Sequence, residues 1–107
     1  LKQIKIIDFI DVSLKDMKPV GNHSHDPTSN QWEIIVVLGD NQKVQIEFRY
    51  RNFGESKVKN KKLKGGDAII IPPGCSLAIM PFNKDVKLIE ISNKAYDAKN
   101  YIIDELF

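Results

Sequence analysis

The part of the chain that decides the fold is residues 66–77, which read GDAIIIPPGCSL. A turn at Gly66 and Asp67 leads into an alanine and three isoleucines at 68–71. This apolar run predicts a buried strand, because β-branched side chains pack well on a pleated surface. Pro73 and Gly74 suit the two central positions of a type II β-turn, since proline presets φ and glycine accepts a positive φ. The stretch therefore predicts a buried strand that is turned sharply back on itself.

Three of the strands predicted before this stretch have a clear apolar or alternating pattern. Residues 2–12 are rich in isoleucine and read as a strand. Residues 31–38 end in IIVVL and stop at GDN, which predicts a buried strand running into a hairpin turn at 39–41. Residues 43–51 alternate between two faces. One face carries Val44, Ile46, Phe48 and Tyr50, and the other carries Gln45, Glu47, Arg49 and Arg51.

The other segments complete an all-β pattern. Residues 56–64 carry five lysines, which indicates a solvated edge strand or, alternatively, a patch that attracts phosphate. Residues 77–81 and 86–92 read as two more strands. The tail, 94–107, holds tyrosines among acidic residues and predicts one short helix or a docked turn. Many short strands with frequent turns predict a sandwich or barrel.

Length and composition limit the class of protein. A chain of 107 residues has the size of one domain, so we expect a single domain over 1–107. A formal charge of +2 gives no electrostatic argument for a nucleic-acid or membrane partner. No apolar run approaches the ~20 residues that span a bilayer. The single cysteine, Cys75, fits a reducing compartment, and we therefore predict a cytoplasmic protein.

Two histidines in residues 21–25, which read GNHSH, are the candidate functional groups. In an extended segment, side chains two residues apart share a face, so His23 and His25 point the same way about 7 Å apart. Residues 26–30, DPTSN, form a loop beside them. The pair therefore either lines a pocket or lies solvated beside this loop.

Residues 66–77 resemble the second signature of the cupin superfamily, in which a glycine, five residues, a proline, any residue, a glycine and two residues precede a histidine. Here Leu77 holds the histidine position. The segment GNHSH is similar to the Arg-Gly-x-His-x-His motif of one cupin branch, the sugar-nucleotide ketoisomerases and their WxcM-like relatives. Residues 96–104, YDAKNYIID, resemble the closing pattern of that branch. Together these matches cover residues 18–107.

The resemblance implies a cupin-type jelly-roll barrel with a short C-terminal helix or turn, assembled as a homodimer. It implies an isomerase that moves the keto group of a dTDP-4-keto-6-deoxyhexose, a nucleotide-linked sugar, between C4 and C3 without a metal or other cofactor. By position, His23 and His25 would be the catalytic base and its partner, in an order left open. Histidine suits both tasks because its pKa of about 6.5 lets it accept and return a proton near neutrality.

The sequence departs from the branch at two positions. Val20 replaces the arginine before the motif glycine, and the tryptophan that is usual soon after the Pro-Pro turn is absent, with Ser76 nearby. Either Arg49, Arg51 or a lysine from another strand substitutes for that arginine in binding the substrate, or the substrate differs, or catalysis has been lost. Gln31 and Glu33 are expected to line the pocket as hydrogen-bonding residues.

Two alternatives remain open. One is a noncatalytic module that binds a sugar nucleotide or serves in assembly. The replacement of the motif arginine by Val20 is the reason for considering it. The other is a metal-binding cupin, whose usual ligands are three histidines and a glutamate. The chain offers His23, His25 and Glu33, but Glu33 follows His25 by eight positions rather than the usual four or five. We therefore predict no metal site.

Overall fold

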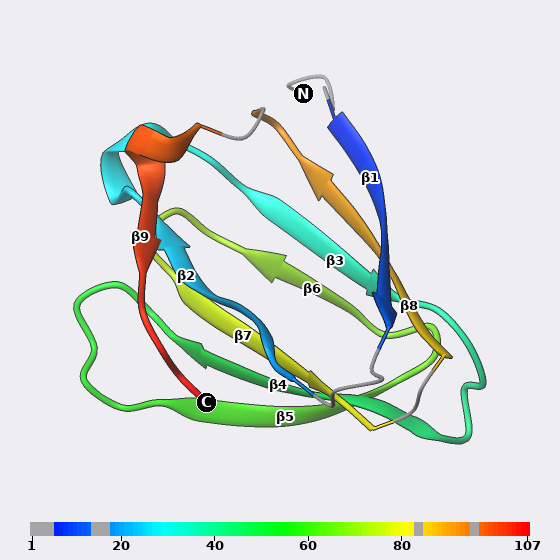
Figure 1. Ribbon diagram of the computed structural model, residues 1–107. Coiled ribbons are helices and arrows are strands. Elements are labelled where there is room, and N and C mark those ends of the chain that lie inside the picture. The colour runs from blue at the N-terminus through cyan, green and yellow to red at the C-terminus, as the bar shows by residue number, and fades with distance from the viewer. Residues whose placement is uncertain (1–5, 14–17, 83–84, 95–96) are drawn as a thin grey trace.

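The computed structural model describes residues 6–13, 18–82, 85–94 and 97–107 (Figure 1). These residues form nine strands and two short 3-10 turns, with no α-helix among them. No helix within these ranges is long and apolar enough to span a membrane. The all-β prediction is confirmed.

The strands form two antiparallel sheets. The first sheet has the order β1 (Ile6–Ser13), β8 (Asp85–Ser92), β3 (Glu33–Val37) and β6 (Ala68–Ile71). The second has the order β5 (Lys59–Lys64), β4 (Val44–Arg51), β7 (Ser76–Pro81), β2 (Val20–His25) and β9 (Tyr101–Ile103). In the described part of the chain, the paired strands join within each sheet and not across the two sheets. The two-sheet jelly-roll arrangement agrees with the prediction, whereas closure into a barrel is not confirmed.

The predicted hairpin at 39–41 is wrong. β3 pairs with β6 and β8, and β4 pairs with β5 and β7, so this loop carries the chain from the first sheet to the second. The loop packs against the turn that precedes β6, where the N–H of Gly65 donates to the carbonyl of Asp40 at 3.1 Å. A Cβ at Gly65 would lie 2.1 Å from the carbonyl oxygen of Gly39. The loop after β3 and the turn before β6 are therefore in direct backbone contact, which only glycine at position 65 allows.

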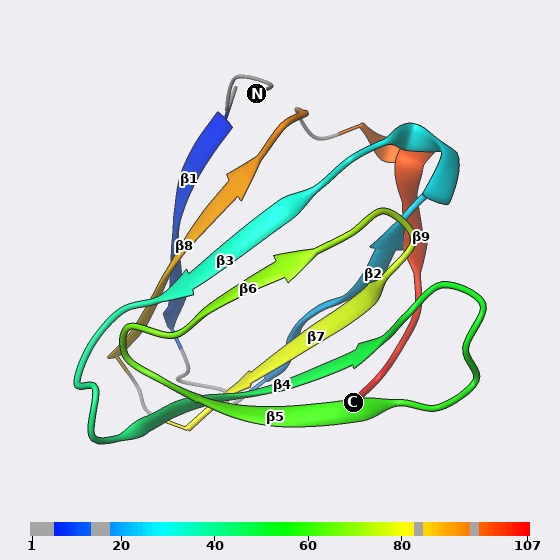
Figure 2. The same ribbon diagram turned by 180° about the vertical axis from the view of Figure 1, so that it is seen from behind.

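The strand at 68–71 is not the buried strand that the apolar run predicts. β6 lies at the edge of the first sheet beside β3 (Figure 2), and the side chain of Ile70 is 65% exposed while Ile71 is buried. The chain then passes to β7 in the other sheet rather than back on itself. The type II turn is confirmed, since Cys75 N–H donates to the carbonyl of Pro72 at 3.2 Å and Gly74 has φ +80°.

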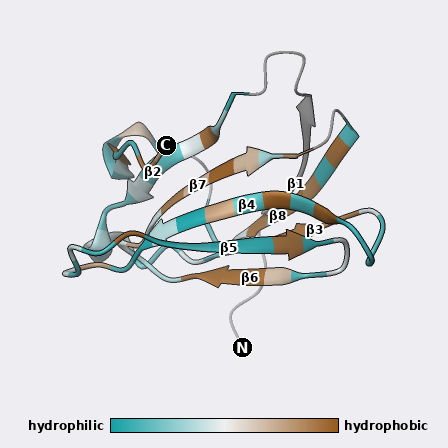
Figure 3. Cartoon of the chain, turned by 90° about the horizontal axis from the view of Figure 1, so that it is seen from below, coloured by the Kyte–Doolittle hydropathy of each residue, from teal (hydrophilic) through white to brown (hydrophobic). Residues whose placement is uncertain are grey.

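The core lies between the two sheets. The alternation predicted for 43–51 holds from Ile46 onward, because Ile46 and Phe48 are buried against Ile35, Val37 and Leu88 of the other sheet. It fails at Gln45, which is buried where the pairing of β4 with β5 shifts register. The lysine-rich segment forms β5, the outer strand of the second sheet, as predicted for a solvated edge. Figure 3 shows β5 hydrophilic over most of its length and β6 largely hydrophobic.

The tail forms a docked turn rather than a helix. Ala98–Asn100 is a single 3-10 turn, and the strand β9 follows it directly along β2. The N-cap Asp97 accepts a hydrogen bond from the N–H of Lys99 at 3.0 Å, which caps the start of the turn. Tyr96, part of the predicted closing pattern, lies outside the described residues.

Candidate active site

An irregularity in β2 positions the two histidines. The pairing of β2 with β7 shifts register between Gly21 and His23, and Asn22 between them has φ +51°. Asparagine tolerates this left-handed conformation better than most residues. Its backbone carbonyl accepts a hydrogen bond from the N–H of Asp104 at 2.9 Å, and its side-chain oxygen accepts one from Leu106 at 2.8 Å. The bulge therefore docks the C-terminal segment beside the histidines.

The Pro-Gly turn supports the end of β2. Gly74 donates its N–H to the carbonyl of His25 at 3.1 Å. A Cβ at Gly74 would lie 2.9 Å from Cβ of Phe53 and 3.0 Å from Cβ of Pro27, so this position needs glycine for space as well as for φ. The turn that carries the cupin-like signature is thereby bonded to the histidine motif.

A cavity of about 170 Å³ lies between the sheets at this end of the molecule. Five strands, β2, β3, β7, β8 and β9, contribute its lining: Val20, Gly21, His23, Glu33, Ile35, Leu77, Ile79, Leu88, Glu90 and Tyr101. The walls are largely apolar, and the polar groups come from four of these strands. His25 lies beside the cavity, with its ring T-shaped to the rings of His23 and Tyr101 at 5.0 and 6.4 Å between centroids.

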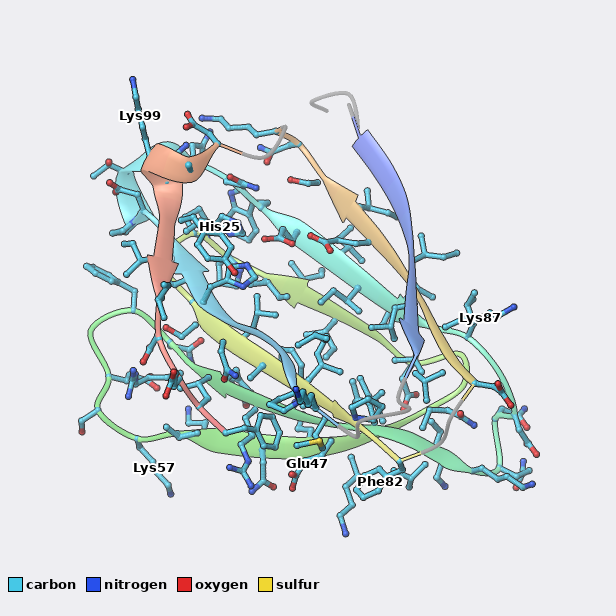
Figure 4. The ribbon with its side chains drawn as sticks, viewed as in Figure 1. His25, Glu47, Lys57, Phe82, Lys87 and Lys99 are labelled. Atoms are coloured by element: carbon cyan, nitrogen blue, oxygen red, sulfur yellow. The ribbon has the colours of Figure 1, made fainter. Side chains whose placement is uncertain are left out.

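His25 is held by a carboxylate from the facing sheet. Its Nδ1 lies 2.7 Å from Oε1 of Glu33, and the side chain is directed into the space between β2 and β3 (Figure 4). Burial alone raises the pKa of Glu33, but hydrogen bonds from His25 and Glu90 and the nearby imidazoles outweigh burial and lower it. An ionised Glu33 stabilises a proton on Nδ1 of His25, which leaves Nε2 as the nitrogen free for other contacts.

His23 has a different environment. Its ring stacks on Tyr101 with centroids 4.3 Å apart and an interplanar angle of 16°. Burial is the main cause that lowers the pKa of His23, and the neighbouring His25 lowers it further. At pH 7 this imidazole is therefore neutral and can both donate and accept a hydrogen bond.

The structure brings together three of the six predicted site residues: His23, His25 and Glu33. Gln31 is buried near them, but its amide Nε2 donates to Ser92 Oγ at 3.3 Å and it does not line the cavity.

Arg49 and Arg51 lie on the outer face of the second sheet, against the tail. Arg49 donates to the carbonyl of Leu106 at 2.9 Å, and its guanidinium lies 4.0 Å from the centre of the Phe107 ring. Arg51 forms an ion pair with Asp104. Neither guanidinium lines the cavity, and both hold the C-terminal segment on the sheet.

Two cavity residues were not predicted as functional, Glu90 and Tyr101. The inward position of Glu90 could have been predicted from the sequence, because Glu90 alternates with Val86, Leu88 and Ser92, which are buried on the inward face of β8. The position of Tyr101 could not have been predicted from local pattern, because its place opposite His25 depends on the pairing of β9 with β2.

His23, His25 and Glu33 also form a candidate metal site. Their ligand atoms all lie within 4.8 Å of one another, and no other such group occurs in the described ranges. Two imidazoles and a carboxylate suit zinc or non-haem iron, so the donor set fits a metal ion. Nδ1 of His25 and the Glu33 carboxylate contact each other directly, so a cation would have to displace the proton between them.

Comparison with known proteins adds to this geometry. No protein-family model matches the sequence, and no curated protein matches it. Solved structures do match. A variant of the 3,4-ketoisomerase QdtA from Thermoanaerobacterium thermosaccharolyticum, solved with TDP-4-keto-6-deoxyglucose, superposes with a TM-score of 0.74 at 18% identity over 92% of this chain. WlaRA from Campylobacter jejuni, a TDP-fucose-3,4-ketoisomerase, superposes with a TM-score of 0.75 at 24% identity over 95% of the chain.

The chain has the same fold as these 3,4-ketoisomerases. It spans 65% of the length of QdtA and 69% of that of WlaRA. The same fold matches 27% of CapF, a capsular polysaccharide assembling protein from Staphylococcus aureus, with a TM-score of 0.66 at 17% identity over 94% of this chain. The ketoisomerase-like fold therefore occurs both in small isomerases and within a larger protein.

Proposed function

We propose that the protein is a sugar-nucleotide 3,4-ketoisomerase, which moves the keto group of a dTDP-4-keto-6-deoxyhexose between C4 and C3 by histidine acid/base chemistry. The observation that carries the proposal is the His23–His25 pair, backed by Glu33, at a cavity between the sheets. Further support comes from the fold, since QdtA binds TDP-4-keto-6-deoxyglucose.

The reaction needs a base beside the substrate carbon. In our proposal Nε2 of His25 removes the proton from C3, and the electrons of that bond form the C3–C4 double bond of an enediolate as the C4 carbonyl oxygen takes the negative charge. The proton then returns from His25 to C4, and the proton of the C3 hydroxyl passes to the C4 oxygen, which leaves a ketone at C3 and a hydroxyl at C4. Glu33 favours this step because an ionised carboxylate on Nδ1 stabilises the imidazolium that forms.

His23 supplies the second group. A neutral imidazole can donate a hydrogen bond to the oxygen on which charge develops, which is worth most where water is excluded. The cavity walls at Ile35, Leu77 and Leu88 provide such a dry surround. His23 therefore stabilises the enediolate in this proposal while His25 transfers the proton.

The cavity limits what part of the substrate it holds. Its 170 Å³ is below the ~300–1,000 Å³ of sites that enclose a whole drug-sized ligand. We propose that the sugar ring enters and that the nucleotide lies outside. Binding of substrate by Gln31, Arg49 and Arg51 stays a prediction, and either arginine would have to release the C-terminal segment to reach a phosphate.

The test is turnover of dTDP-4-keto-6-deoxyglucose in deuterated water, followed by proton NMR. We expect deuterium at C4 of the product and at C3 of recovered substrate. His25→Ala should remove both signals while the domain stays folded, although it unfolds at a lower temperature because Glu33 loses its partner. Ser24→Ala, between the histidines, should keep turnover. Normal turnover by His25→Ala would disprove the assignment of the base.

A noncatalytic sugar-nucleotide module is the second candidate. It is favoured by Val20 in place of the arginine of the ketoisomerase motif and by the match to part of CapF. Calorimetric binding of the nucleotide sugar without deuterium entering the sugar would establish it. Exchange at C3 would exclude it.

A metal-binding cupin is the third candidate, favoured by the His23, His25 and Glu33 cluster. These residues would hold the ion, which would act as a Lewis acid on a bound oxygen. Metal analysis of the purified protein before and after dialysis against a chelator distinguishes a metal-binding cupin from a metal-free isomerase. Stoichiometric metal that is lost from Glu33→Gln would support this candidate, and full isomerase activity after chelation would contradict it.

Homodimer assembly and a cytoplasmic location stay predictions of this proposal, with no nucleic-acid or membrane partner. Cys75, the single cysteine of the sequence, is buried. Sedimentation equilibrium tests the dimer, and fractionation of the source cells tests the location.

A further inference from the structure

A second hollow lies where the outer strands of the two sheets, β5 and β6, face each other. It measures about 390 Å³ and shares no lining residue with the first cavity. We call it the seam groove, and define it by Phe48, Tyr50, Lys61, Ile70 and Pro72. β5 forms one side and β6 the other, and each is the outer strand of its sheet. The groove thus runs between two strand edges.

The hydrogen bonds of β6 show which of its backbone groups face this groove. Val37 N–H donates to the carbonyl of Asp67 at 2.8 Å, which makes that pair a bonded position of the ladder with β3. Bonded positions alternate in an antiparallel ladder, so the pairs Ile35 with Ile69 and Glu33 with Ile71 are bonded as well. Ala68 and Ile70 therefore direct their N–H and C=O groups away from β3, toward the groove.

The two edges are protected very differently. β5 carries lysines along its length, which is how natural sheets discourage strand addition. β6 reads AIII, carries no charge, and exposes 65% of Ile70. Figure 3 shows the same contrast between a hydrophilic β5 and a hydrophobic β6. An uncharged, apolar edge with outward backbone donors is a surface on which another strand can add.

The charge around the groove indicates what kind of strand fits. The ammonium groups of Lys59 and Lys61 lie 6.0 and 5.9 Å from the centre of the Tyr50 ring, which lines the groove. Figure 4 shows the neighbouring Lys57 projecting outward at the end of this edge. The lysines of the segment are Lys57, Lys59, Lys61, Lys62 and Lys64. Lys61 lines the groove, and Lys59 beside it is paired with Glu55 at 3.3 Å. A strand with carboxylates would be attracted to this lysine-rich edge, whereas a second copy of the chain would bring the same lysines.

We propose that the seam groove binds an extended acidic segment of a partner protein, which adds as a strand to β6. Its backbone pairs with Ala68 and Ile70, its apolar side chains enter the groove against Phe48 and Tyr50, and its carboxylates face the lysines of β5. Main-chain bonds supply the affinity in such a complex and alternate side chains supply the specificity.

The test uses two fluorescein-labelled octapeptides that differ only in charge, one with valine and glutamate along the same strand face and one with valine and lysine along that face, and measures fluorescence anisotropy. We expect the acidic peptide to bind at least tenfold more tightly and to weaken as salt is raised. Ile70→Pro removes an outward N–H without touching the ladder to β3 and should weaken binding at least tenfold. Ile70→Thr keeps the N–H and a branched side chain and should bind within about twofold of the wild type.

Two further measurements distinguish a loss of binding from misfolding of the Ile70→Pro variant. Ala68→Pro removes the other outward N–H and should act like Ile70→Pro. In the wild-type protein, amide exchange at Ala68 and Ile70 should slow when the acidic peptide is added. Equal binding of the two peptides, unchanged binding by both proline variants, or self-association of the chain in place of peptide binding would each overturn the proposal.

Discussion

The Nδ1 atom of His25 lies 2.7 Å from Oε1 of Glu33, although the two residues belong to different sheets. Glu33 is 2% exposed and pairs in the first sheet with Ile71 and Ser92, so its carboxylate is fixed by the ladders on both sides. The contact therefore ties the histidine strand to the facing sheet and sets the orientation of the imidazole.

Glu33→Gln should lower kcat for the proposed isomerase roughly a hundredfold, within the range for loss of acid/base assistance, with KM changed less than about threefold. The amide keeps the shape of the side chain but cannot stabilise an imidazolium. Steady-state kinetics measure the effect. Glu47→Gln, on the outer face of β4, is the matched control and should leave kcat unchanged. A normal kcat in Glu33→Gln would show that the carboxylate has no part in proton transfer.

Tyr101→Ala should lower kcat by about tenfold, because the stacked ring at 4.3 Å that orients His23 is lost. Tyr101→Phe keeps the ring and should stay within about threefold of the wild type. The comparison separates the ring from the hydroxyl. An equal loss of kcat in the two variants would show that the hydroxyl group of Tyr101, and not its ring, is needed for activity.

Gly74→Ala should destabilise the protein by about 2–3 kcal/mol, because an L-residue at positive φ costs about 1–2 kcal/mol and the new methyl also meets Phe53 and Pro27. Gly54→Ala is the matched control. Its φ is +82°, but no atom lies within 4 Å of the added Cβ, so it should show the backbone cost alone. Urea unfolding measures both. Equal losses would mean that the space around the turn is not restrictive.

Asp104 predicts a response to acid. Hydrogen bonding from Ser76, and then the hydrogen bond and charge of Arg51, lower the pKa of Asp104 below its ordinary 3.8. The unfolded chain therefore takes up this proton at a higher pH than the folded chain, so the stabilisation is present above about pH 4 and is lost as the pH falls through the lowered pKa. Asp104→Asn should lose less stability than the wild type between pH 5 and pH 3, measured as urea midpoints. Parallel losses would show that the C-terminal segment is not held by this carboxylate.

The strands of the fold could be predicted from local pattern, whereas their partners could not. The alternation of residues 43–51 shows its buried face directly, since side chains in a strand point alternately to opposite sides. The IIVVL run before residue 39 looks the same whether the chain then turns back or crosses to another sheet. Only the pairing of β3 with β6 and β8 excluded the hairpin. For the same reason the AIII run predicted burial, while its place at a sheet edge left Ile70 exposed.

The sequence by itself determined the all-β class, the type II turn at Pro73 and Gly74, and the closeness of His23 and His25, because each depends on residues within a few positions of one another. Only the tertiary structure decided that Glu33, Glu90 and Tyr101 reach the same cavity, and that Arg49 and Arg51 hold the tail instead. These contacts join residues far apart in the chain, and their positions follow from the packing of two sheets rather than from any local preference.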